Sequence, residues 1–147
     1  MGKIVDWVDG RKTVREMTEA DLSQEGLDDR KARAMAKVLW KCDQIAAGAV
    51  VGYVRMEVAA WPAKASHARA MIGGGVSSVL LSTEAAELGV TELSLAERIV
   101  VKAEVYETLI AKLAAIRQKA EALIERAPSA EVLQATMETI YAELGAL

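Results

Sequence analysis

The two side chains with the most reactive chemistry in this sequence are a single cysteine and a single histidine. Cys42 stands between Lys41 and Asp43, and His67 lies in the segment KASHARAM. A thiol and an imidazole can act as nucleophile and base, or bind a metal ion, but either role needs further groups close by. No second type of metal ligand stands near His67 in the sequence. We therefore interpret Cys42 as a small buried hydrophobic residue and His67 as a surface or partly packed side chain.

Two other patterns are of kinds found in catalytic or binding sites. The segment IGGGVSSV, residues 72–79, is glycine-rich, but it lacks the Gly-Lys-Ser/Thr ending of a phosphate loop and follows no clear strand. We interpret it as a flexible hinge between short helices. The acids of each pair Glu84/Glu87 and Glu121/Glu125 have helical spacing, as on a solvated helix face, and the second pair lies beside bases. The sequence thus predicts no enzymatic activity, no cofactor, no metal ion and no small-molecule substrate.

The composition is that of a helical protein. The 147 residues suit one domain of ordinary size, and 52% of them are hydrophobic although only 4% are aromatic. Much of the apolar content is Ala, Val and Leu, of which Ala and Leu favour helices. The net charge is −3, acids and bases are interspersed, and no basic stripe stands out, so we expect no nucleic-acid partner. A single cysteine cannot form an internal disulfide.

No segment of the sequence is typical of a membrane protein or a secreted one. The N-terminal stretch MGKIVDWVDGRK has no apolar core of the kind found in signal peptides. The most apolar run, residues 45–54, is about half of the roughly 20 residues that a membrane-spanning helix needs. Arg55 and Glu57 then interrupt it. We expect a buried helical segment there and no membrane association.

Residues 1–17 are predicted to form a β-hairpin arm. In KIVDWVDGRKTVREM, apolar and β-branched residues flank Asp9-Gly10, which is a favoured two-residue turn. Because an isolated hairpin is marginal in water, the arm must pack on something or pair with another chain. Trp7 is a candidate contact.

Residues 18–147 are predicted to form a helical domain. Thr18 can cap a first short helix, which Gly26 interrupts, and a long helix over residues 29–60 follows. Trp61-Pro62 ends this helix or restarts it. Its apolar or small positions alternate four and three residues apart, which is a heptad pattern: Met35, Leu39, Cys42, Ala46, Ala49, Tyr53, Met56 and Ala60.

The second half of the sequence carries local signals for three more helices. Ser77 or Ser78 can cap a short helix that Gly89 ends, Thr91 or Ser94 begins a long helix over residues 95–126, and Ser129 caps a final one. The long helix again has a heptad pattern: Leu95, Ile99, Lys102, Tyr106, Leu109, Leu113, Ile116, Ala120 and Leu123. It also carries a second apolar set: Val101, Val105, Ile110 and Ala114.

The predicted fold is mainly α, a helical hairpin or bundle with two long heptad-patterned helices and a small N-terminal β-hairpin. Two helices of similar length suit an antiparallel pair. The second apolar set is more than one neighbour needs, so it covers either the short helices or a second copy of the chain. The side chains predicted to lie in an interface or in the core are Trp7, Trp40, Trp61, Tyr106 and Ile116.

Two stretches carry a resemblance to a viral family. The segment EVAAWPAKASHARAMI and the region from ELGVTELSL to ALIERA resemble the helical C-terminal module of bacteriophage tail and tail-fibre-type proteins, and VREMTEADL resembles the segment that introduces such modules. The chain departs from the family's pattern at Ala60, Lys64 and His67. The matching positions are Glu57, Trp61, Gly89, Leu95, Ala96, Ile99, Arg117 and Gln118.

The resemblance implies a non-enzymatic structural subunit of a phage tail: a fibre, baseplate or fibre-attachment component. Its partners would be copies of itself, as a trimer or hexamer, and other tail proteins. It would be assembled in the host cytoplasm and reside in the virion. One alternative is a cytoplasmic tail-fibre assembly chaperone, absent from the mature particle. Another is a free-standing helical adaptor with no viral role.

Overall fold

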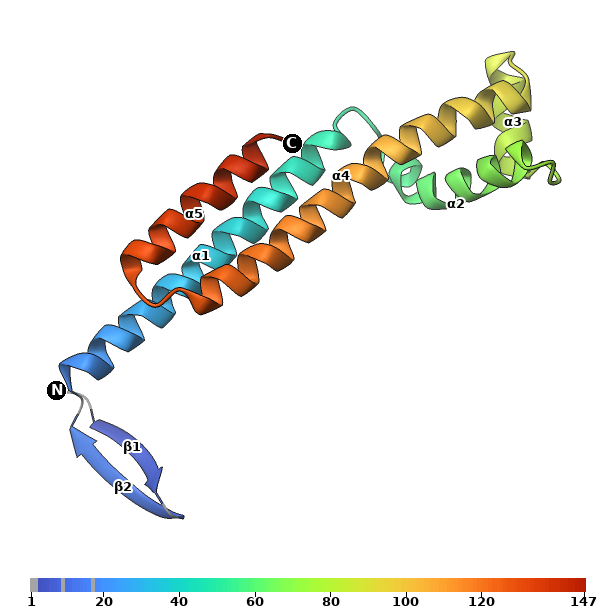
Figure 1. The fold of residues 1–147 in the computed structure, drawn as a ribbon. Helices are drawn as coiled ribbons and strands as arrows, with labels where there is room; N and C mark the ends of the chain where they lie inside the picture. The colour runs from blue at the N-terminus through green and yellow to red at the C-terminus, as the bar shows by residue number, and fades with distance from the viewer. Residues whose placement is uncertain (1–2, 9, 17) are drawn as a thin grey trace. The chain divides into compact units, whose positions relative to one another are not determined.

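A computed structural model of the chain describes residues 3–8, 10–16 and 18–147, without the side chains of residues 6–8, 22 and 25. It confirms the mainly α fold with a small N-terminal hairpin (Figure 1). The described residues form these elements: β1 Lys3–Val8, β2 Arg11–Glu16, α1 Glu19–Ala49, α2 Arg55–Ile72, α3 Val79–Leu88, α4 Glu92–Arg126 and α5 Ala130–Gly145.

The chain folds into two compact units. Unit 1 consists of Met1–Lys41 and Ile116–Ala146, and unit 2 consists of Cys42–Ala115 with Leu147. Unit 1 groups the hairpin with helices, whereas the sequence suggested an arm over residues 1–17 and one helical domain after it. That boundary stays a prediction.

The hairpin is paired as predicted on either side of Gly10, and Asp9, the other predicted turn residue, lies outside the described residues. β1 and β2 are antiparallel, and the pair Val8↔Arg11 closes the register around the turn. Gly10 has φ of +74°, a conformation that glycine adopts without steric penalty. The cross-strand pair Val5↔Val14 is exposed, and no further strand joins the hairpin among the described residues.

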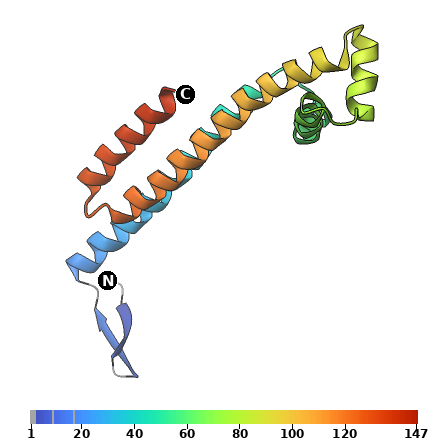
Figure 2. The ribbon, with the colours of Figure 1, turned by 45° about the vertical axis from the view of Figure 1, so that its right-hand side comes forward.

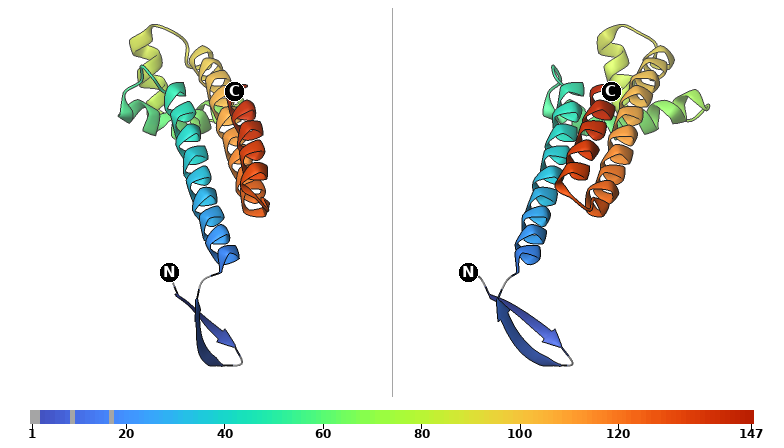
Figure 3. Two further views of the ribbon diagram at one scale, coloured as in Figure 1. Left: turned by 90° about the vertical axis from the view of Figure 1, so that its left-hand side faces the viewer. Right: turned by 60° about the vertical axis from the view of Figure 1, so that its left-hand side comes forward.

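In unit 1, three helices lie side by side, with α4 antiparallel to α1 and α5 (Figures 1 and 3). The Lys31 ammonium on α1 donates to the Glu125 carbonyl on α4 at 2.8 Å, and Lys119 on α4 pairs with Glu143 on α5. Large branched side chains fill the space between them, each worth about 1.5–3 kcal/mol when fully buried. The buried residues are Leu27, Ala34, Val38, Ala120, Ile124, Ala127, Leu133, Ile140 and Leu144.

The buried face of α1 lies one residue before the predicted heptad face at two positions and coincides with it at Cys42. Ala34 and Val38 are buried, whereas Leu39 is 43% exposed and Met35 is half-buried. Both stripes are apolar, so helical periodicity fits either one. Packing against the other helices of unit 1 selects the stripe with the smaller side chains.

The predicted long helix over residues 29–60 is wrong at both ends. α1 begins at Glu19 and continues through Gly26, and it ends at Ala49. Gly52 then has φ of +92°, and Tyr53 N–H donates to the Val50 carbonyl in the turn. The β-branched residues at 50, 51 and 54 also favour helices weakly. The predicted burial of residues 45–54 is wrong as well, because Val51 and Val54 are exposed.

Pro62 neither ends nor begins a helix. α2 runs from Arg55 to Ile72 with Pro62 inside it. Proline has no N–H, so the bond that this position would donate to the carbonyl of Val58 is not made. Tertiary contacts of α2 in unit 2 offset that loss.

The other predicted helix caps are confirmed, with Ser78 and Thr91 selected from the alternatives, so that α4 begins at Glu92 and not at the predicted residue 95. Backbone N–H groups donate to Ser78 Oγ, Thr91 Oγ1 and Ser129 Oγ at 3.2–3.3 Å, each in the first turn of the helix that follows. Gly89, with φ of +65°, ends α3 in the left-handed conformation. These caps satisfy N–H groups that have no partner inside a helix.

The core of unit 2 is built mostly from small side chains. Ala68 from α2, Leu81 and Ala85 from α3, and Leu95 and Ala96 from α4 are all buried together. The partly buried hydrophobic residues Met71, Val90, Ile99 and Val100 pack around them. Alanines at the contacts allow the three helices to approach closely.

Candidate interaction site

Two of the predicted interface residues lie in an aromatic row in unit 2. The Trp61 ring packs edge-to-face on Tyr53 at a centroid distance of 4.9 Å and on Tyr106 at 5.3 Å, with interplanar angles of 84° and 81°. This geometry is the favourable one for aromatic quadrupoles. Trp61 and Tyr106 are half-buried, so the row joins the segment after α1, α2 and α4. The contact with Tyr53 was not predicted, because it depends on the turn at Gly52.

Two ion pairs add to the packing of α2. Lys64 pairs with Glu84 on α3, and Arg69 Nη2 lies 2.7 Å from Glu107 Oε2 on α4. The hydrogen bond to Glu107 and its negative charge raise the pKa of Arg69. These pairs position α2 against its neighbours in unit 2 (Figure 2).

The other three predicted interface residues have different environments. Trp40 on α1 is 62% exposed and stands beside the exposed Leu39. Ile116 on α4 is half-buried. The backbone of Trp7 pairs with Lys12 in the hairpin, and its side chain lies outside the described part. Of the four predicted interface residues whose side chains are described, the structure therefore brings Trp61 and Tyr106 together.

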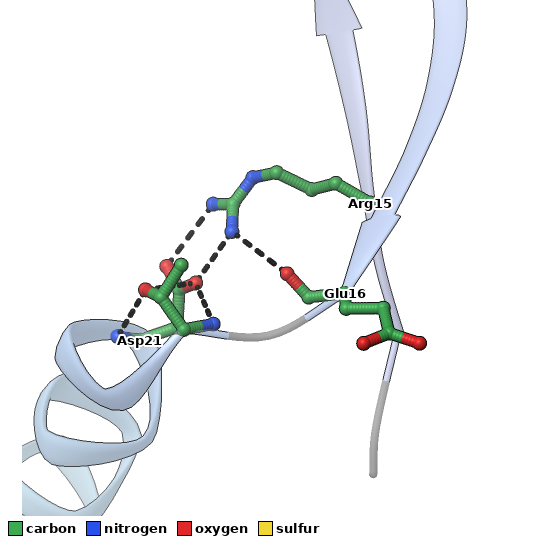
Figure 4. Close-up of polar contacts among 4 residues, drawn as sticks. Arg15, Glu16 and Asp21 are labelled. Atoms are coloured by element: carbon green, nitrogen blue, oxygen red, sulfur yellow. Dashed lines mark hydrogen bonds and ion pairs between the residues drawn. The ribbon is translucent and has the colours of Figure 1, made fainter.

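The hairpin is attached to α1 through one carboxylate. Asp21 accepts two hydrogen bonds from the Arg15 guanidinium, at 2.5 and 3.0 Å (Figure 4). Asp21 Oδ2 also accepts from Thr18 N–H at 2.8 Å, and Asp21 N–H donates to Thr18 Oγ1 at 3.3 Å. Thr18 and Asp21 thus form a capping box. The Asp21 carboxylate accepts hydrogen bonds from both the helix start and the hairpin. The Arg15 hydrogen bonds, followed by those from Thr18, hold the pKa of Asp21 far below its ordinary value.

Apolar side chains remain exposed on helices whose cores are complete. Val101 and Val105 of the second apolar set are 62% and 69% exposed, one turn apart on α4. In unit 2, Met56 on α2 is also well exposed, as are Val51 and Val54 before it. The second set therefore does not cover the short helices, which was one of its two predicted roles.

The residues with reactive side chains do not assemble into a metal centre. Cys42 is buried, as predicted for a small hydrophobic residue. His67 is half-buried, and its Nδ1 atom is buried without a hydrogen-bond partner in the described part of the chain. No group of three or more potential metal ligands occurs among the described residues.

Known protein families, curated proteins and solved structures were compared with this chain, and none of them matches it. None of the helices in the described part has the length and apolarity needed to cross a membrane.

Proposed function

We propose that this chain is a non-enzymatic structural component of a bacteriophage tail, in the fibre, the baseplate or the fibre attachment, and that it acts by helix-mediated assembly. The observation that carries the assembly role is the exposed apolar surface. Val101, Val105 and Trp40 stand on helices that already bury another face. The phage setting rests on the resemblance described above.

Burial of these side chains is the driving force for assembly. A valine moved fully out of water gains about 1.5–3 kcal/mol, so the two valines on α4 are a substantial anchor for a partner helix. Large exposed apolar side chains grouped on one face are typical of interaction surfaces. The partners are copies of this chain and neighbouring tail proteins.

The hairpin is a second means of attachment. Both of its outer edges have no strand partner among the described residues, and extended segments of other proteins bind such edges through backbone hydrogen bonds. The contact of Arg15 with Asp21 orients the hairpin on α1. A partner strand therefore meets an oriented edge, which lowers the entropy lost on binding.

Quantitative mass spectrometry of gradient-purified virions tests the proposal. We expect the chain at a fixed ratio to the other tail proteins. A Val101→Ser/Val105→Ser variant should be incorporated at a lower ratio, while a control changing exposed polar residues of the same helix, Thr108→Ser/Lys112→Gln, should match the unmodified chain. Presence in infected-cell lysate but not in virions would contradict the structural role and favour the assembly chaperone.

A further inference from the structure

Although the net charge is only −3, the chain contains one strongly basic and one acidic segment. Between Asp29 and Asp43 the sequence carries five bases and no acid, and residues 70–97 carry four glutamates and no Lys or Arg. The expectation that charges are interspersed is therefore wrong for these segments. The basic segment belongs to α1 in unit 1, apart from Cys42, and the acidic one includes all of α3 in unit 2.

The basic segment borders a hollow between α1 and α5. The hollow has a volume of about 310 Å³, and both helices contribute to its lining within unit 1. Arg30, Arg33 and Lys37 supply three positive charges from successive turns of α1. Its apolar and uncharged lining is Ala34, Ala130, Leu133, Gln134, Met137 and Tyr141.

Two of the three cations have no ion-pair partner among the described side chains. Glu131 lies near Arg30, and the pKa of this glutamate is lowered first by backbone N–H and by the Ser129 hydroxyl, and then by Arg30. Arg33 and Lys37 form no ion pair in the part of the chain that the structure describes. The hollow therefore combines unneutralised positive charge with an apolar floor, which suits an acidic segment that also carries aliphatic side chains.

The outer face of α3 has that composition. Leu81 and Ala85 point into the unit 2 core, so the exposed face of this helix carries Val79, Leu80, Thr83 and Glu87. Val79 is 80% exposed, and Glu87 forms no ion pair among the described residues.

We propose that the hollow between α1 and α5 binds the outer face of α3 from a second copy of this chain. Leu80 and Val79 cover the apolar floor, and Glu87 lies against Arg33 and Lys37. This inference rests on the self-assembly in the proposed function and adds to it a second contact between copies, distinct from the exposed valines of α4. A nucleic acid fits less well, because a phosphate backbone gains nothing from the apolar floor. Since the two surfaces differ, the contact is either reciprocal in a dimer or head-to-tail in a ring or filament.

Sedimentation velocity of the full chain over a range of concentrations tests the contact by charge reversal. Arg33→Glu/Lys37→Glu in the hollow, and Thr83→Lys/Glu87→Lys on α3, should each weaken self-association about tenfold or more. A chain with all four changes restores opposite charges and should associate again. The control Arg55→Glu/Lys112→Glu alters the net charge as much as the hollow variant does, at exposed positions of α2 and α4, and should behave as the unmodified chain. Circular dichroism verifies that each variant is folded.

Each other result overturns the inference. If only the hollow variant loses self-association, a different segment occupies the hollow. If neither variant loses it, the copies contact each other elsewhere, and self-assembly itself is not contradicted. A hollow variant that associates normally but is no longer retained on DNA would identify nucleic acid as the ligand. An unmodified chain that is monomeric at every concentration excludes the contact, and the virion measurement then decides separately whether the chain is a tail subunit.

Discussion

The two units bury different kinds of side chain between their helices. Unit 1 buries large branched residues from separate helices, including Val38, Ile140 and Leu144, each at most 2% exposed. Unit 2 places Leu81 and Leu95 among alanines and adds a row of aromatic rings beside them. Where few large side chains are buried, each carries a larger share of the stability. Where the contacts are alanines, the helix backbones are close and tolerate no added volume.

The largest expected effect comes from Leu81→Ala in unit 2. Leu81 is fully buried, so its truncation should lower the free energy of unfolding by about 2–5 kcal/mol through lost transfer energy and the cavity left behind. Hydrogen exchange should show the greatest loss of protection at amides of α2 and α3. The same truncation in unit 1, Leu144→Ala, removes one of several large buried side chains and should lie toward the lower end of that range. Equal losses from the two variants would remove the contrast between the cores.

Ala68→Leu tests the close approach of helices in unit 2. Ala68 is fully buried among α2, α3 and α4, and added methyl groups force shifts that typically cost about 1–3 kcal/mol. Denaturation midpoints in urea would measure the loss. The matched change Ala70→Leu, at an exposed position of the same helix, should leave the midpoint nearly unchanged. A stabilised Ala68→Leu variant would mean that this core has unfilled space.

Trp61→Leu tests the aromatic row. Leucine keeps an apolar side chain but loses two edge-to-face contacts, each worth about 0.5–1.5 kcal/mol beyond burial. Trp40→Leu is the control, because Trp40 is mostly exposed and makes no ring contact with a described aromatic residue. Thermal unfolding should show a lower Tm for the first variant alone. A comparable drop for both would indicate that the ring contacts contribute little.

The smallest expected effect is local and concerns the hairpin attachment in unit 1. The pKa of Asp21 lies far below its ordinary value of 3.8, so the folded state gains stability above that value and loses it only as pH falls toward the lowered pKa. The amide chemical shift of Thr18 should therefore stay constant from pH 7 to about pH 4. Asp21→Asn should change that shift at pH 7 and loosen the hairpin, without altering the cores. A change in the Thr18 amide shift with its midpoint near the ordinary aspartate pKa would contradict the contact of Asp21 with Arg15 and Thr18.

Local signals in the sequence predicted local structure well. The caps at Ser78, Thr91 and Ser129 and the turn at Gly10 depend on residues within a few positions, so they were predictable. The interruption after Ala49 was not predicted, because the helical spacing of apolar residues continues across it. Gly52 supplies the positive φ of this turn, and nothing in the apolar spacing distinguishes it from the small residues before it.

Tertiary contacts determine which helix faces are buried and which distant residues meet, and the sequence did not predict these. Burial of Ala34 and Val38 in place of Met35 and Leu39 depends on which face meets the other helices of unit 1. The same holds for the contact of Trp61 with Tyr106, whose positions are far apart in the chain. The bases beside the hollow could be recognised in the sequence as the run after Asp29. Most of the apolar lining comes from α5, so its place beside these bases could be known only from the fold.

Unit 1 is assembled from two stretches of sequence that are made at different times. The hairpin and the start of α1 contact each other over a few residues, so all the groups of this contact leave the ribosome together. The apolar face of α1 around Val38 must wait for the rest of unit 1, because residues 42–115 are synthesised before residues 116–146. At about 5–20 residues per second, the apolar face of α1 stays uncovered for roughly 5–20 s. The nascent chain therefore offers chaperones a binding site that vanishes only when α5 emerges.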